Sequence, residues 1–335
     1  MKKVTTTSMF LLIVSLSFAQ IVDIPDANFK SVLVNGLCAD LDGDGALDGD
    51  VDTNNDGEIQ LSEAQSVYKL SIQNENIASL EGIQSFTILE NLICGINDIT
   101  NLDLSQNLNL IFLECGNNQL TALDVSNNLA LESLNMHNNQ VTAIDVSSNT
   151  LLFSFVCYGN QLESIDVSQN PDLDFFVCYN NQITSIDVSQ NLVLRHLNCY
   201  GNEISILDLS QNSNLQKLSA QENALTYLSI KNGNNLNLIR MFAQDNPELK
   251  CIEVDDETYA NSQDCNFPTD SWCKDTTAMY VEDCVLGIND NQNNSSDIKI
   301  YPNPTKGNLS IILKDLADVI SISVFDVNGQ LFFYR

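Results

Sequence analysis

Apolar residues recur along the chain at fixed distances, and this repeat is the dominant feature of the sequence. A leucine stands every 21 residues, at Leu89, Leu110, Leu131, Leu152, Leu173, Leu194 and Leu215. An apolar residue follows after three positions, a cysteine, methionine or alanine after five, an asparagine after eight and an aliphatic residue after ten. With degenerate units at Val67 and Leu238, the pattern predicts a stack of about nine near-identical coils.

Each coil is expected to contribute one short strand. The second apolar residue and the cysteine-type residue are two apart, so both point inward, and neighbouring strands stack about 4.8 Å apart into a parallel sheet of about eight strands. The consensus L-x-x-L-x-C-x-x-N-x-L resembles the leucine-rich-repeat family. The resemblance implies a right-handed solenoid over residues 67–254, a β-dominated member of the α/β repeat class.

Several repeated positions are interpreted as structural. The asparagines are expected to pair with backbone groups in the turn that follows each strand. The repeat cysteines fill an apolar slot and are interpreted as buried free thiols; they are Cys94, Cys115, Cys157, Cys178 and Cys199. The second half of each coil carries an apolar pair with an aspartate between, as in Leu102-Asp103-Leu104. We expect these aspartates to accept hydrogen bonds from N–H groups of the turn; a ladder of bound cations is the alternative. This half of each coil is expected to be extended or 3₁₀.

The strand residues between the inward positions face outward and are expected to form the binding surface on the concave side. Tyr158, Tyr179 and Tyr200 occupy one position in three consecutive coils and should stack as a ladder. An exposed aromatic patch in an acidic protein favours recognition of a protein or a glycan. Simple stabilisation of the sheet by cross-strand aromatic pairs is the alternative. The candidate ligand-binding residues are Phe112, Phe153, Tyr158, Phe175, Tyr179, His196, Tyr200 and Phe242.

Residues 20–66 are expected to form an N-terminal cap. Asp26 precedes a helical pattern whose apolar face comprises Phe29, Val32, Leu33 and Leu37. Residues 52–63 match the EF-hand calcium loop, with Gly57 at the sharp turn. The predicted calcium ligands are Asp52, Asn54, Asp56, Glu58 and Glu63. A second loop begins with Asp40, Asp42 and Asp44, but has Val51 at its twelfth position, so a second ion is left open. We interpret calcium as a brace between the cap and the first coil.

Four cysteines cluster after the repeats, where residues 255–286 are expected to form a C-terminal cap with Phe267 and Trp272 covering the last coil. Clustered cysteines in an exported chain predict two disulfides, with three possible connectivities among Cys251, Cys265, Cys273 and Cys284. Zinc is the weaker alternative, because no C-x-x-C pair is present. Cys38 has no nearby partner and is expected to be free.

The N-terminus has the form of a secretory signal. Lys2 and Lys3 precede an apolar run at residues 9–16, and Ser17-Phe18-Ala19 offers a cleavage site, so residues 1–19 are expected to be removed. No other segment is long and apolar enough to be transmembrane. The chain carries 44 acidic and 14 basic residues, a net charge of −30. This charge disfavours nucleic acid and anionic lipid as partners.

The last segment contains strand-like alternation and short motifs. After a polar linker at 287–297, residues 298–335 include Tyr301-Pro302-Asn303-Pro304 and Asp326-x-x-Gly329. This segment resembles the C-terminal sorting domain of the type IX secretion system, and the whole plan resembles secreted leucine-rich-repeat surface proteins of the Bacteroidetes. The resemblance implies a partial β-sandwich tail, contact with the type IX machinery and release or attachment at the cell surface. That family's tail continues through further strands, so we expect a truncated fragment.

These features favour a binding or adhesion protein over an enzyme. His137 and His196 lie three coils apart, and neither has an acid or a nucleophile placed for catalysis. The alternative function is a calcium-braced spacer or surface-layer protein without a specific heterologous ligand.

Overall fold

The computed structural model describes residues 20–284, 298–301, 310–313, 323–325 and 331–334. The chain divides after Cys284 into two compact units. The first unit holds the caps and the repeats, and the second holds the strands of the tail. The predicted signal peptide and linker lie outside the described residues.

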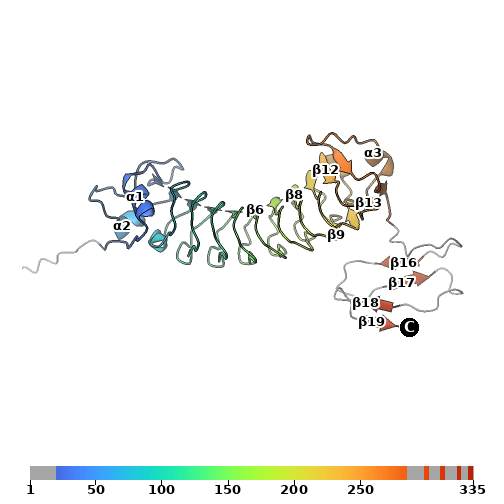
Figure 1. Ribbon diagram of the computed structural model, residues 1–335, viewed down its shortest axis with the longest axis horizontal. Coiled ribbons are helices and arrows are strands. Elements are labelled where there is room, and N and C mark those ends of the chain that lie inside the picture. The colour runs from blue at the N-terminus through green and yellow to red at the C-terminus, as the bar shows by residue number, and fades with distance from the viewer. Residues whose placement is uncertain (1–19, 285–297, 302–309, 314–322, 326–330, 335) are drawn as a thin grey trace, which may run out of the picture. The chain divides into compact units, whose positions relative to one another are not determined.

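The first unit is a row of coils, each of which places one strand in an 11-stranded sheet (Figure 1). Its strands, in spatial order, are β1 (Ala39–Asp40), β2 (Lys69–Ser71), β3 (Asn91–Ile93), β4 (Phe112–Glu114), β5 (Ser133–Asn135), β6 (Ser154–Val156), β7 (Phe175–Val177), β8 (His196–Asn198), β10 (Lys217–Ser219), β12 (Arg240–Ala243) and β14 (Trp272–Lys274). Neighbours are parallel except β1 and β2. The repeats contribute nine of these strands, one more than the eight expected, and the caps add β1 and β14.

The constant register stacks equivalent residues of successive coils inside the solenoid. Leu113 pairs with Leu134, and Phe155 with Phe176, whose rings stack at 5.6 Å. The five repeat cysteines are fully buried and free, as the spacing predicted. Burial raises the pKa of their thiols, to about 12 for Cys199. These cysteines therefore act as small apolar core residues.

The opposite side of the coils is extended, as the short repeat predicted. It contains the 3₁₀ turns η1 (Ile83–Ser85) and η2 (Asn235–Asn237) and a parallel sheet of β9 (Ile206–Asp208), β11 (Tyr227–Ser229), β13 (Cys251–Glu253) and β15 (Met279–Val281). Asp103 accepts a hydrogen bond from the N–H of Ser105 at 3.0 Å. This bond lowers the pKa of Asp103. The equivalent bond recurs at Asp124, Asp145, Asp166, Asp187 and Asp208, which supports the turn interpretation of these aspartates.

The buried asparagine after each strand ties successive coils together. The Asn160 amide nitrogen donates to the carbonyl oxygen of Cys157 at 3.0 Å and to that of Met136, one coil earlier, at 3.1 Å. The Asn160 side-chain oxygen accepts from the N–H of Val141 at 3.1 Å. One side chain thus satisfies backbone groups of two coils that cannot reach water.

The residue before this asparagine adopts a left-handed backbone. Asn117 and Asn138 have φ of 52° and 50°, and Gly159 has φ of 66° in the same position. Asparagine and glycine tolerate this region best, which explains why they recur there. Ile96 occupies the position with φ of 55° although its side chain is β-branched.

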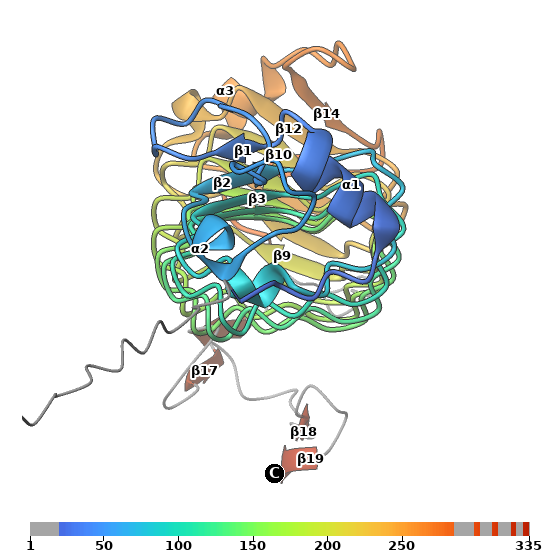
Figure 2. The ribbon, with the colours of Figure 1, turned by 90° about the vertical axis from the view of Figure 1, so that its left-hand side faces the viewer.

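The N-terminal cap lies across the end of the stack (Figure 2). Helix α1 (Ala27–Asn35) begins at Asp26, whose carboxylate accepts from two N–H groups of the first turn. Phe29 and Leu33 are buried as expected. The prediction for Leu37 is wrong: the helix ends before it, and its side chain is 67% exposed. The short helix α2 (Leu61–Ala64) follows the acidic loops.

The C-terminal cap contains helix α3 (Glu257–Asn261) and covers the last coils. Trp272 is buried as predicted, and its indole N–H donates to the carbonyl oxygen of Leu238 at 2.7 Å. The second unit contains two antiparallel pairs, β16 (Ile298–Tyr301) with β17 (Ser310–Leu313) and β18 (Ser323–Phe325) with β19 (Leu331–Tyr334).

Candidate functional site

The outward side chains of the 11-stranded sheet line up in columns, which together we call the strand face. One column follows the register pairs Phe112↔Ser133, Ser154↔Phe175 and Lys217↔Arg240. Because successive outward residues are two apart, another column lies where each strand ends. This last column consists of His137, Tyr158, Tyr179, Tyr200, Gln221 and Gln244.

Four rings of the last column stack on one another, and we call them the aromatic column: His137, Tyr158, Tyr179 and Tyr200. The ring centroids of Tyr158 and Tyr179 lie 4.2 Å apart with an interplanar angle of 9°. Tyr179 and Tyr200 are 5.3 Å apart. His137 stacks on Tyr158 at 4.8 Å. All four side chains remain partly exposed, so the column presents ring edges and polar tips on the strand face.

Asparagines hold the His137 ring in place. Its Nδ1 lies 2.7 Å from Oδ1 of Asn135, and its Nε2 lies 2.7 Å from Nδ2 of Asn117. An amide oxygen accepts and an amide nitrogen donates, so these partners assign the proton to Nδ1. Burial lowers the pKa of His137. The ring is therefore neutral at pH 7 and acts as an aromatic member of the column.

A second group on the strand face combines an aromatic contact with charges. The rings of Phe175 and His196 lie 4.6 Å apart. Burial, and then the positive charges of Arg240 and Lys217, lower the pKa of His196 to about 4. Both cations pair with Asp270, Arg240 at 2.6 Å and Lys217 at 3.4 Å.

The other predicted ligand-binding residues differ in how far they are exposed on the strand face. Phe112 is partly buried on β4, and Phe153, just before β6, is 45% exposed. Phe242 was expected to be open on this face, but it is only 3% exposed. Phe267, from the segment between α3 and β14, packs on it at 5.1 Å. Phe242 is therefore covered by the cap.

Two residues of these groups on the strand face were not among the predicted site residues. His137 joins the aromatic column, and the 21-residue spacing from Tyr158 carried that signal. Lys217 lies in register between His196 and Arg240. The effect of the Lys217 charge on His196 could be recognised only once the structure showed that His196 and Asp270 lie next to it.

The predicted calcium loop folds around the side chain of Gln60. Asp52 and Glu63 are buried, with 1% and 6% of their surface exposed. The Asp52 carboxylate accepts from the N–H groups of Asp56 and Gly57, and Gly57 has φ of 83° at the sharp turn. The loop thus adopts the turn that its sequence predicted.

The Gln60 amide links several predicted ligands of this loop. Its nitrogen donates to the Asp56 carboxylate oxygens at 3.1 and 3.0 Å and to the Glu58 carbonyl oxygen at 3.3 Å. Its oxygen accepts from the Asn54 amide at 2.5 Å. Both Glu63 oxygens accept hydrogen bonds, including one from Thr53 at 2.9 Å. The oxygens that could bind a metal ion lie close together, but they accept hydrogen bonds from N–H and O–H groups of the loop.

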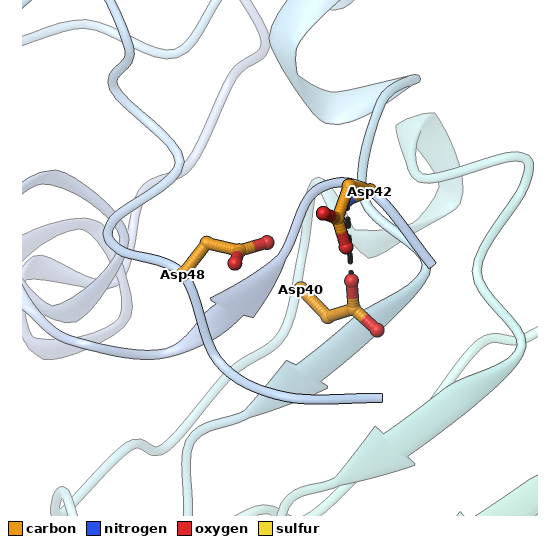
Figure 3. A group of neighbouring side chains, drawn as sticks. All are labelled: Asp40, Asp42 and Asp48. Carbon is orange, nitrogen blue, oxygen red and sulfur yellow. Dashed lines mark hydrogen bonds between the residues drawn. The ribbon is translucent and has the colours of Figure 1, made fainter. Parts of the chain in front are cut away.

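The preceding loop gathers three carboxylates. Asp40, Asp42 and Asp48 offer oxygens within 4.8 Å of one another, the one such group of three among the described residues (Figure 3). The sequence had placed Asp44 in this set instead of Asp48. Asp44 turns to the N–H of Ala46, whereas the Asp48 carboxylate accepts from the N–H of Leu41 at 2.8 Å, which holds it beside Asp40.

The four clustered cysteines form two disulfides. Cys251 pairs with Cys284, and Cys265 with Cys273. The first bond ties β13 to the end of the first unit, and the second closes a short loop before β14. Cys38 is free and buried.

Comparisons with known proteins bear on both units. Residues 299–334 match the family model of the secretion system C-terminal sorting domain. The chain is similar to the functional domain of InlJ from Listeria monocytogenes, described as including a cysteine ladder, with 32% identity and a TM-score of 0.59 over 71% of this chain and 52% of that chain. It therefore spans about half of that chain's length.

A second solved structure shares the fold at lower identity. An internalin C2 from Listeria monocytogenes is 19% identical, with a TM-score of 0.53 over 72% of this chain and 99% of that chain. No curated protein matches the sequence. Among the described residues, no helix is long and apolar enough to cross a membrane.

The repeats identify the fold of the chain, and the tail indicates where the protein is exported. The β-dominated solenoid of 21-residue coils has the leucine-rich-repeat fold of these neighbours, and the tail is a type IX secretion sorting domain. Such a domain directs a protein to the outside or the surface of the cell. The chain is therefore a secreted or cell-surface leucine-rich-repeat protein that carries a type IX sorting domain.

Proposed function

We propose that the strand face captures a protein ligand and that the aromatic column lies at the centre of the contact. The observation that carries this proposal is the stack of four partly exposed rings along adjacent coils. Tyrosine combines a large apolar ring with a polar tip and is enriched where proteins bind one another.

The surroundings of the column favour binding over a purely structural role. The outward residues of β5 and β6 are Ser133, Asn135, Ser154 and Val156, all uncharged in a chain with a net charge of −30. The core beneath them is already filled by Leu134 and Phe155, both fully buried. The coils therefore do not need the outer rings to exclude water, and depletion of charge is typical of the core of an interface.

Truncation of the column tests the proposal. Full-length protein is immobilised and exposed to secreted and surface proteins from the organism's habitat, and captured proteins are identified by crosslinking and mass spectrometry. Replacing Tyr158, Tyr179 and Tyr200 with alanine should abolish capture, because each buried aromatic hot spot contributes about 2 kcal/mol or more.

A matched control keeps this test specific. Leu108, Leu129 and Leu192 are exposed apolar side chains in the turns of other coil positions, and their triple alanine variant should capture as well as the wild type. Equal capture by the tyrosine variant would remove the aromatic column from the function. Self-association of the full chain without any heterologous partner would instead favour the spacer role.

We also propose that the loop at residues 52–63 binds one calcium ion as a brace for the cap. The support is chemical: Asp52 and Glu63 are buried carboxylates, and within the described chain no lysine or arginine forms an ion pair with either. Buried anionic oxygen is costly without a cation, and carboxylate and amide oxygens are the donors that calcium prefers. Calcium would replace the Gln60 amide as the partner of Asp56 and of the Glu58 carbonyl.

A further inference from the structure

The aromatic column ends at Tyr200, and the next two coils change the chemistry of the same position. Strands β8, β10 and β12 keep their register, so Gln221 and Gln244 follow Tyr200 in the column. One face of the Tyr200 ring contacts Tyr179. The other side of Tyr200 borders the two glutamine side chains in a pocket.

A disulfide-closed loop of the cap also lines this pocket. We call residues 264–271 the hook; they lie between α3 and β14 and rise above the strand-bearing side of the last coils (Figures 1 and 2). The Cys265–Cys273 disulfide closes the hook. Asp270 anchors it through Arg240 and Lys217, and Phe267 packs on Phe242. Three separate contacts therefore hold the hook against the strand face.

The hook and the end of the aromatic column border an open pocket of about 550 Å³. Phe267, the two cysteines of the Cys265–Cys273 disulfide and Tyr200 all line it. Pockets that hold small ligands have volumes of about 300–1,000 Å³ and mainly apolar walls with a few polar groups. This pocket fits that description, and 57% of the Phe267 side chain remains exposed.

Two polar features of the pocket restrict what it can hold. The side-chain oxygens of Gln221 and Gln244 are buried and accept no hydrogen bond within the described chain. An unpartnered buried carbonyl is costly, so either amide gains if it turns towards a ligand that brings a hydrogen-bond donor. Glu222 and Asp245 also line the pocket, and both residues are exposed. They favour positive charge next to the occupant.

We propose that this pocket binds a tyrosine or tryptophan side chain presented by a basic segment of a protein partner. The ring would pack between Tyr200 and Phe267, and the flanking cations would face Glu222 and Asp245. Its O–H or N–H would pair with a glutamine oxygen once that amide turns from its closed position towards the pocket. This inference rests on the proposed function of the strand face and assigns it an anchor site at its C-terminal end.

Short peptides test the pocket without the unknown partner. Binding to the full chain is detected by saturation-transfer NMR and its affinity is measured by titration. The probes are N-acetyl-Lys-Tyr-Lys-amide, its Glu-Tyr-Glu analogue without basic flanks, its Lys-Leu-Lys analogue without an aromatic ring, and methyl β-glucopyranoside. The Lys-Tyr-Lys peptide should bind at least about fivefold more tightly than each of the others, a difference of about 1 kcal/mol. Tighter binding of the glucoside or of the leucine peptide would overturn the proposal.

Variants then tie the binding to this pocket. Phe267→Ala and Gln221→Leu should each weaken the Lys-Tyr-Lys peptide by about fivefold or more, and Glu222→Gln should remove most of its advantage over Glu-Tyr-Glu. Leu192→Ala, an exposed change outside the pocket, should have no effect, and fluorescence of the buried Trp272 reports that each variant is folded.

The outcomes separate this inference from the proposed function. Peptide binding that survives Phe267→Ala and Gln221→Leu refutes the pocket, even if a protein partner is still captured through the aromatic column. Loss of protein capture in the tyrosine variant bears on the column and leaves the peptide result to decide the pocket.

Discussion

Replacing Asn160 with alanine should destabilise the solenoid by several kilocalories per mole. The change leaves the Val141 N–H without its one hydrogen-bond acceptor, because only the Asn160 side chain accepts from it among the described residues. The carbonyl oxygens of Met136 and Cys157 each lose one donor but keep another, the amides of Asn139 and Asn181. A buried orphan N–H costs about 1–3 kcal/mol and each lost hydrogen bond about 1 kcal/mol, so we expect about 4 kcal/mol in total.

A second asparagine ladder provides an internal comparison. The Asn149 amide donates to the carbonyl oxygens of Val125 and Asn128, but both oxygens also accept from backbone N–H groups. The Asn149 side-chain oxygen is buried and has no partner in the described chain, so its removal offsets part of the loss. We expect Asn149→Ala to cost about 0–2 kcal/mol, clearly less than Asn160→Ala.

Urea unfolding followed by far-ultraviolet circular dichroism measures both variants. Asn127→Ala is the control, because Asn127 is exposed and makes no side-chain hydrogen bond within the described chain. Hydrogen exchange at the Val141 amide should accelerate in Asn160→Ala alone. If Asn160→Ala unfolds at the same urea concentration as Asn127→Ala, the asparagine bonds do not hold the coils together and the reasoning fails.

Four further predictions concern the cap, the thiols, pH and the backbone. Calorimetric titration should detect one calcium ion per chain and a raised melting temperature, both absent in Glu63→Gln; no heat at millimolar calcium would dismiss the site. Native protein should not react with a thiol reagent until denatured, since the six free cysteines are buried; prompt labelling would contradict this burial. The pKa of His196 is lowered from 6.5 to about 4, so its stabilising contribution is complete above pH 6.5 and falls away towards pH 4. The urea midpoint should therefore drop more over this range in the wild type than in His196→Gln, and parallel profiles would refute it. Ile96→Asn should raise stability by about 1 kcal/mol, because asparagine tolerates the positive φ better; unchanged unfolding would show that the position is unstrained.

The sequence predicted the repeated features well because one register governs them all. The spacing alone predicted that the cysteines lie in the core and that Tyr158, Tyr179 and Tyr200 stack. Both predictions follow because side chains alternate between the two faces of a strand and each coil repeats the previous one. The aspartate turns followed from the same regularity.

Features set by contacts between distant, non-repeated segments escaped prediction. Phe242 is covered because the hook folds back over it, and no local pattern reveals which strand a cap loop will reach. The pairing of the four clustered cysteines depends on the same path of the chain. In the acidic loop, Asp48 replaces Asp44 because a backbone contact at Leu41 positions its carboxylate.

The asparagine bonds also bear on how the molecule can change in length. The carbonyl oxygen of Cys157, which accepts from both Asn160 and Asn181, belongs to a pattern that returns unchanged one repeat later. A whole repeat inserted by gene duplication would find the same donors and acceptors on both sides and would lengthen the sheet by about 4.8 Å. After deletion of one complete repeat, the two flanking coils would form the same hydrogen bonds with each other. Gain or loss of a few residues would instead leave donors and acceptors of adjacent coils out of register. Variation among natural copies of this gene should therefore come in multiples of one full turn.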